Sequence, residues 1–161
     1  MRVLTLGIAL VALAITTNAN AGTCNGEFGW LGKGNVYGMG EGSFVFTGEF
    51  SGAFFNTDTS DPTHKAATQC PGLWHVRADG SGNSNGNCIM RDAEGDKIFF
   101  EWSGTGTFPV TGGPFTFLGG TGKFNGVTGS GTFRGATVAS DDGGNGMGYA
   151  TWTNCTYSLP N

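Results

Sequence analysis

The sequence predicts an all-β protein, on three observations. First, residues 43–55 alternate, with Phe44, Phe46, Phe50 and Phe54 on even positions and mostly small or polar residues on odd ones. A period of two is typical of a half-buried strand. Second, similar runs recur at short spacing between clusters of Gly, Asn and Asp. Third, beyond the first 21 residues no stretch combines a helical period with caps. Many short strands favour a sandwich or a closed barrel.

Nine segments have strand character. In order they are residues 27–31, 43–55, 73–78, 88–91, 97–103, 105–110, 115–118, 130–139 and 146–159. In the last segment we expect the odd positions from Met147 to Tyr157 to share one face, with Trp152 on the other. Residues 56–69 are polar and predict a loop, and residues 79–87 contain mainly Gly, Ser and Asn and predict a flexible hairpin loop.

The first 21 residues have the layout of a signal peptide. Arg2 supplies a positive start, residues 3–15 are apolar, and Ala19-Asn20-Ala21 forms a small-x-small cleavage site. We therefore expect a secreted or periplasmic protein with one mature domain over residues 22–161. An uncleaved anchor is the alternative, although the apolar run is short for a membrane span. No later stretch is long and apolar enough to cross a membrane.

The charge of the mature chain argues against one class of partner. Without Arg2, 7 basic residues (8 − 1) stand against 12 acidic ones, which gives a formal charge of −5, and the basic residues form no run. Nucleic acid binding needs clustered Lys and Arg, so we expect no nucleic acid partner. Gly makes up 31 of the 161 residues, well above the usual ~7%. The 13 Phe residues nevertheless provide enough apolar surface to argue against disorder.

Four cysteines in an exported chain predict two disulfides. Three pairings are open. We favour Cys70–Cys88, which closes a local loop, together with Cys24–Cys155, which ties the two ends of the domain. A structural metal is the alternative, but the chain has no CxxC pair. We expect neither a metal nor another cofactor.

The glycine-rich stretch Gly119-Gly-Thr-Gly-Lys-Phe124 lies between two strand-like runs. It resembles the GGTGxF hairpin of allene oxide cyclase and dirigent-like barrels. With Cys70, Cys88 and Asp92-Ala-Glu-Gly-Asp-Lys97 it is similar to a group of secreted bacterial proteins of unknown function that carry that barrel. The resemblance implies an antiparallel, calycin-type β-barrel, and we choose the barrel over the sandwich mainly on this ground. Closure also removes exposed strand edges, which a chain poor in Lys protects badly. No catalytic residue of that family can be matched to a position here.

An acidic loop is the first candidate for other chemistry. Asp92, Glu94 and Asp96 alternate in a short segment, and oxygen ligands so placed could hold Ca²⁺. The full twelve-residue loop of an EF-hand is absent. We favour a hairpin turn with Gly95 at a position of positive φ.

Single ionisable residues are the second candidate. His64 and His75 are the only histidines, and no Ser- or Cys-centred motif accompanies them, so we expect structural or surface roles for both. Glu49 and Glu101 lie in the middle of strands, where an inward carboxylate would be an acid–base candidate. The large apolar residues on the opposite face favour an outward position for both.

The aromatic residues give the function hypothesis. The expected ligand-binding residues are Phe44, Phe46, Phe50, Phe54, Trp74, Trp102 and Trp152. Such rings can line a cavity for a small apolar molecule, and the simpler alternative is that they fill the core, as in other small barrels. Gly48 and Gly52 share the Phe face, so we expect Leu at either position to fill any free volume while the barrel still folds.

We expect a non-enzymatic protein that binds a small apolar ligand or a surface partner. A cyclase or isomerase acting inside the barrel, as the resemblance allows, is the alternative. A structural envelope protein is a further alternative, and oligomerisation stays open.

Overall fold

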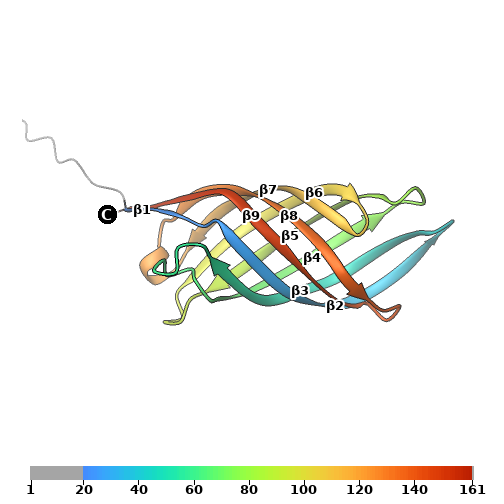
Figure 1. Cartoon of the computed structure of the whole chain (residues 1–161), viewed down its shortest axis with the longest axis horizontal. Helices are drawn as coiled ribbons and strands as arrows, with labels where there is room; N and C mark the ends of the chain where they lie inside the picture. The colour runs from blue at the N-terminus through green and yellow to red at the C-terminus, as the bar shows by residue number, and fades with distance from the viewer. Residues whose placement is uncertain (1–19, 161) are drawn as a thin grey trace, which may run out of the picture.

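A computed structural model describes residues 20–160 of the chain. Nine strands and one short 3₁₀ helix follow one another in a meander (Figure 1). Their bounds are β1 Asn20–Thr23, β2 Gly26–Gly40, β3 Ser43–Asn56, β4 Ala66–Val76, β5 Ser81–Arg91, β6 Lys97–Thr107, β7 Val110–Gly120, η1 Gly122–Phe124, β8 Thr128–Ser140 and β9 Asn145–Leu159. The signal-peptide prediction falls almost wholly outside the described residues, and β1 begins at Asn20, just before the expected cleavage site.

The sheet closes on itself as an eight-stranded antiparallel barrel. Strands β2 to β8 pair in sequence order, and β9 pairs with both β8 and β2, which joins the two ends of the sheet. Strand β1 continues the line of β2 and pairs with the last four residues of β9. The predicted antiparallel β-barrel is therefore confirmed. No helix in residues 20–160 has the length and apolar character needed to cross a membrane.

The alternation of the Phe-rich strand β3 puts its even positions inside the barrel. Phe54 is fully buried, and the ring of Phe50 contacts those of Phe46 on the same strand, Trp30 on β2 and Trp102 on β6. Glu49 is paired with Lys33 and Pro71 on the outer face, and Glu101 is exposed. The predicted outward position of both carboxylates agrees with the register.

A row of glycines at one level of the barrel makes room for large rings. Gly34, Gly48, Gly72 and Gly86 are consecutive cross-strand partners on β2 to β5, and Gly86 is paired with Trp102 on β6. A Cβ atom at Gly72 would lie 2.7 Å from the Trp102 ring, and one at Gly86 would lie 2.9 Å from it. The high Gly content therefore reflects aromatic packing against bare backbone.

This packing corrects the expectation for two glycines. A Cβ atom at Gly48 would collide with the carbonyl oxygen of Lys33, and one at Gly52 would collide with that of Gly29. Neither position adjoins free space. Leu at Gly48 or Gly52 would thus disturb the strand backbone instead of filling a cavity.

Several local predictions were wrong. Residues 66–69, expected in a loop, begin β4, and residues 105–110, expected as one strand, contain the turn between β6 and β7. The segment at residues 79–87 was expected to be a flexible loop, but residues 81–87 belong to β5 and pair with both β4 and β6. The small residues of this segment permit a strand because the partner strands supply the rings. In β9, the odd positions do not share one face: Met147 and Tyr149 are exposed, whereas Cys155 and Tyr157 are buried. A register shift near Asn154, whose φ is 52°, inverts the alternation.

One end of the barrel is closed by side chains and crosslinks. Tyr157 donates a hydrogen bond from its hydroxyl to Asp61 Oδ2 at 2.7 Å, which fixes the loop between β3 and β4. Phe124 of η1 is buried in the core. The structure joins Cys24 to Cys155 and Cys70 to Cys88, the pairing favoured from the sequence. The core residues gather at this end, so any opening into the interior lies toward the other end.

Candidate functional site

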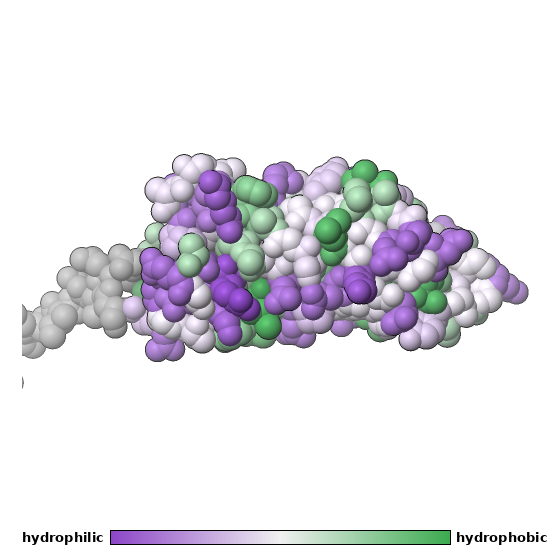
Figure 2. Space-filling view, turned by 90° about the horizontal axis from the view of Figure 1, so that it is seen from below, coloured by the Kyte–Doolittle hydropathy of each residue, from purple (hydrophilic) through white to green (hydrophobic). Residues whose placement is uncertain are grey.

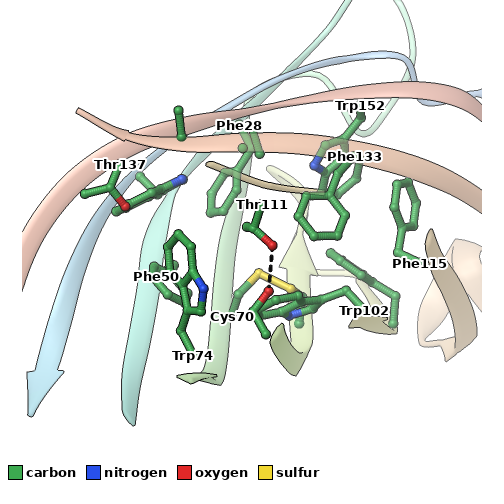
Figure 3. Close-up of a pocket in the computed structure, with 17 residues that line it drawn as sticks. Phe28, Phe50, Cys70, Trp74, Trp102, Thr111, Phe115, Phe133, Thr137 and Trp152 are labelled. Carbon is green, nitrogen blue, oxygen red and sulfur yellow. Dashed lines mark hydrogen bonds between the residues drawn. A yellow bond between two sulfur atoms is a disulfide. The ribbon is translucent and has the colours of Figure 1, made fainter. Parts of the chain in front are cut away.

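Two adjoining cavities occupy the interior and the open end of the barrel. The inner one, called the chamber below, has a volume of about 70 Å³ and is enclosed mainly by aromatic side chains (Figure 3). The outer one, called the vestibule, measures about 300 Å³ and is bounded by the hairpins β2–β3, β6–β7 and β8–β9. The cavities share four lining residues, namely Trp30, Phe50, Trp74 and Thr137. The two cavities therefore adjoin at the level of these side chains.

The structure brings together six of the seven aromatic residues expected at the site. Phe50, Trp74, Trp102 and Trp152 line the chamber. Phe44 and Phe46 line the vestibule, together with Phe50 and Trp74. Phe54 lines neither cavity. Its ring packs on Trp152 with a centroid distance of 4.4 Å in the closed end of the core.

Several lining residues were missed in the sequence. The rings of Phe28, Trp30, Phe115 and Phe133 come from strands β2, β7 and β8. Trp30 packs edge-on against Phe50 with a centroid distance of 5.0 Å. The signal for Trp30 was present, because Phe28 and Trp30 continue an alternation through residues 26–36 that the glycines obscure.

The chamber wall is apolar apart from hydroxyl groups and indole N–H groups. Its hydroxyl-bearing residues are Ser84, Thr111 and Thr137, and no ionisable side chain from residues 20–160 lines it. The Ser84 and Thr111 hydroxyls form a hydrogen bond of 2.9 Å inside the barrel. Figure 3 shows the Thr111 hydroxyl at the centre of the surrounding rings. The chemistry available is shape, apolar contact and a few hydrogen bonds.

The remaining ionisable candidates lie outside the chamber. Glu101 borders a separate outer depression on β5 to β7. His64 shares a hydrogen bond of 2.9 Å between its Nδ1 and the carbonyl oxygen of Asn56, which accords with a structural role. His75 lies opposite the inward Trp74 in the alternation of β4. The vestibule rim does carry Asp141 and Asp142 from the β8–β9 hairpin.

The Asp141 carboxylate at the rim accepts hydrogen bonds from residues of its own turn. Its Oδ1 accepts hydrogen bonds from the backbone N–H groups of Gly143 and Asn145, and its Oδ2 accepts one from the Asn145 side chain. The hydrogen bonds from the Asn145 side chain and backbone hold the pKa of Asp141 below its ordinary value. The carboxylate therefore stays charged and caps the hairpin.

The acidic loop between β5 and β6 holds a lysine. Oxygen atoms of Asp92, Glu94 and Asp96 lie within 4.8 Å of one another. Lys123 Nζ from η1 lies 2.5 Å from Asp92 Oδ2 and 2.8 Å from Glu94 Oε2. Gly95 has a φ of 95°, as the turn interpretation predicts. The ammonium group supplies the positive charge that a metal ion would otherwise bring to this turn.

The molecule is thus a closed, disulfide-linked antiparallel barrel with an aromatic cavity that opens at one end. No family model matches the chain, and no curated protein matches its sequence. A solved structure, that of the pterocarpan synthase dirigent protein GePTS1, is similar over 98% of each chain, with a TM-score of 0.46 and 11% sequence identity.

The outer wall has its own apolar groups. Leu31 of β2 and Met147 of β9 are cross-strand partners, and both are exposed, as is Tyr149 two residues further along β9. Figure 2 shows hydrophobic groups in separate patches between hydrophilic ones on one face of the barrel. Such patches are compatible with contact to another protein.

Proposed function

We propose that this protein binds a small, flat, apolar molecule in the chamber and vestibule without transforming it. The observation that carries the proposal is the pair of adjoining cavities, both of which are lined by Trp30, Phe50 and Trp74. A chamber of about 70 Å³ is too small for a drug-sized ligand, since such sites measure about 300–1,000 Å³. The vestibule of about 300 Å³ brings the combined space into that range.

Binding in place of catalysis is supported by the chemistry of the wall. A general acid or base must reach the reacting atom with a titratable group. The described side chains around the chamber offer only hydroxyls and indoles. The acidic groups of the vestibule lie at the rim, where Asp141 caps its turn. A cyclase or isomerase acting by shape alone is the alternative, and product analysis after incubation with the bound molecule separates the two.

Titration with 2-acetylnaphthalene tests the binding proposal. We expect quenching of Trp fluorescence with a dissociation constant in the micromolar range, which needs only about 8 kcal/mol. Ala150 is buried and lines the chamber, so Ala150→Leu should fill it and weaken binding at least tenfold. Ala139→Leu is the matched control because Ala139 is exposed. Unchanged binding in Ala150→Leu, checked for folding by circular dichroism, would remove the chamber from the proposal.

Export is part of the proposal. Two disulfides persist in oxidising compartments, and both cysteine pairs of this chain are bonded. Cleavage after Ala21 would leave Gly22 and Thr23 as the remainder of β1. The mass of the intact secreted protein should match a chain that begins at Gly22 and carries no free thiol. Alkylation of a cysteine without prior reduction would argue against the oxidised form.

A surface partner is the second candidate, favoured by the exposed pair Leu31 and Met147. If this patch joins two copies of the chain, the sedimentation coefficient should rise with protein concentration. Leu31→Lys should remove that rise without altering 2-acetylnaphthalene binding. A concentration-independent coefficient would leave the barrel cavity as the better-supported site.

A further inference from the structure

The buried hydroxyl pair in the chamber has an unused donor. Ser84 and Thr111 are only 3% and 9% exposed, and their oxygens lie 2.9 Å apart. Two hydroxyls carry two hydrogens, and the bond between them uses one. The other hydrogen has no acceptor among the side chains and backbone groups of residues 20–160. A buried donor without an acceptor loses the free energy that water would have given it.

A second unpartnered donor lies in the same wall. The indole Nε1 of Trp102 is buried and has no hydrogen-bond partner in the described chain. Trp102 lines the chamber together with Ser84 and Thr111, and Figure 3 shows it beside the disulfide and below Thr111. Its ring is held in place by contact with the backbone at Gly72 and Gly86. Two donors, the second hydroxyl hydrogen and the Trp102 N–H, therefore lie in the wall of an otherwise apolar cavity.

The aromatic surroundings make these donors selective. Phe133 contacts Trp102 edge-on with a centroid distance of 5.7 Å, and Phe50 does so with a distance of 6.3 Å. A Cβ atom at Gly104 would lie 2.7 Å from Thr111 Oγ1 and 3.0 Å from both Ser84 Oγ and the Phe133 ring. The bare Gly104 thus lets the hydroxyls and the rings share one wall. A hydrogen bond formed among these rings is stronger than one in bulk water, because its surroundings have a low dielectric constant.

From these donors we infer that the chamber selects ligands that carry a hydrogen-bond acceptor, such as a carbonyl oxygen, at their inner end. The oxygen accepts from the Ser84–Thr111 pair, while the apolar ring system lies in the outer cavity between Trp30, Phe50 and Trp74. The inference rests on the proposed function and deepens it, because it names the ligand class. An apolar molecule without an acceptor would fill the same space and leave the donors unpaired.

A matched ligand pair tests the inference. 2-Acetylnaphthalene and 2-isopropylnaphthalene have nearly the same shape, and only the first carries an acceptor. We compare the ratio of their dissociation constants in the wild type with the ratio in the double variant Ser84→Ala/Thr111→Val. The double comparison cancels the different hydration of the two molecules. We expect the preference for the ketone to fall about five- to tenfold in the double variant, as the loss of one hydrogen bond implies.

Thr105→Val is the control, because Thr105 of β6 is exposed and lines neither cavity. The ratio in this variant should stay within twofold of the wild-type ratio. Equal ratios in the wild type and the double variant, with both molecules bound, would overturn the acceptor rule and leave the proposed function standing. Failure of both molecules to bind the wild type would overturn the two together.

An infrared measurement needs no variant. The carbonyl stretching band of bound 2-acetylnaphthalene should lie at lower wavenumber than in cyclohexane, because a hydrogen bond weakens the C=O bond. A band at the cyclohexane position, with the ketone bound, would contradict the inference. This readout applies even if the double variant fails to fold.

Discussion

Lys123 Nζ of η1 lies 2.5 Å from Asp92 Oδ2 of the β5–β6 turn. The contact ties the glycine-rich connection after β7 to a turn 31 residues earlier. The same turn accepts a hydrogen bond from the Lys123 backbone N–H to Asp96 Oδ2 at 3.1 Å. Residues 119–126 therefore stabilise the closed end of the barrel through contacts with the β5–β6 turn.

Removing the lysine should loosen this end. Asp92 has a side chain that is only 3% exposed, so Lys123→Met would leave its carboxylate without its cationic partner. We expect a loss of about 1 kcal/mol in the free energy of unfolding, since the ammonium is about one-third exposed and solvent weakens the pair. Urea denaturation measures this loss of free energy. Lys97→Met, at a lysine for which no ion pair is found in residues 20–160, should change stability by less than half as much.

The loss of unfolding free energy caused by Lys123→Met should depend on pH. Burial alone would raise the pKa of Asp92, but hydrogen bonds from Lys123 and from the N–H groups of Asp96 and Glu94 hold that pKa below its ordinary value. A lowered pKa contributes stability above the unfolded value of about 4 and loses it as pH falls through the folded value. The pKa of Lys123 is raised, chiefly by its hydrogen bond to Asp92. The raised pKa of Lys123 contributes stability that is fully present below its unfolded value of about 10 and is lost as the pH rises above it.

The difference in the free energy of unfolding between the wild type and Lys123→Met should therefore be largest between about pH 5 and pH 10. It should become smaller below about pH 4. Denaturation curves at pH 3 and pH 7 check this. A difference that is equal at both values would mean that Lys123 acts through packing on Phe124, whose ring centroid lies 5.8 Å from Nζ.

Gly95 should be required for its backbone conformation alone. Its φ is 95°, and a Cβ atom there would meet nothing within 4 Å. We expect Gly95→Val to destabilise the fold by about 1–2 kcal/mol, because a β-branched residue resists positive φ. Gly95→Asn should cost less than half as much, since Asn tolerates this region. Equal melting temperatures for the two variants would argue against the backbone explanation.

Calcium should leave the turn unaffected. Lys123 already lies between the carboxylates of Asp92 and Glu94, so a divalent ion would have to displace it. We expect no change in melting temperature with millimolar CaCl₂. A clear rise that disappears in Asp92→Ala would show that the turn binds the metal after all.

The two disulfides should contribute unequally. Cys70 and Cys88 are separated by 18 positions and Cys24 and Cys155 by 131. The chain-entropy model gives about 3 and about 5 kcal/mol respectively. Cys24→Ala/Cys155→Ala should therefore lower the free energy of unfolding more than Cys70→Ala/Cys88→Ala, as measured by denaturation in urea. The reverse order would indicate that the end near β1 is already loose in the folded state.

The barrel could be predicted from the sequence because its strands alternate clearly where they are rich in Phe. Residues 43–55 alternate Phe with small or polar residues, and β3 follows that pattern. The strand at residues 81–87 was missed because its residues are small and polar, and its pairing comes from β4 and β6. The inversion in β9 was missed because a bulge at Asn154 depends on Asn25, whose Oδ1 accepts from the Cys155 N–H at 3.0 Å.

The residues that line the candidate site were predictable in part for a similar reason. Large rings are visible in a sequence, and six of the seven expected residues line the cavities. Phe54 differs only in its level along the barrel axis, which strand tilt and register decide. Ser84 and Thr111 are 27 positions apart and lie in segments without a motif. Their contact exists only because the closed sheet turns both side chains inward.

The location of a bound ligand tests the central claim most directly. Intermolecular nuclear Overhauser effects between 2-acetylnaphthalene and the assigned indole and methyl protons of the protein give that location. We predict contacts from the ring protons to Trp30 and Trp74 and from the acetyl methyl group to Trp102, with none to Leu31 or Met147 on the outer wall. Contacts confined to Leu31 and Met147, or none to any of the chamber tryptophans at saturating ligand, would contradict the account.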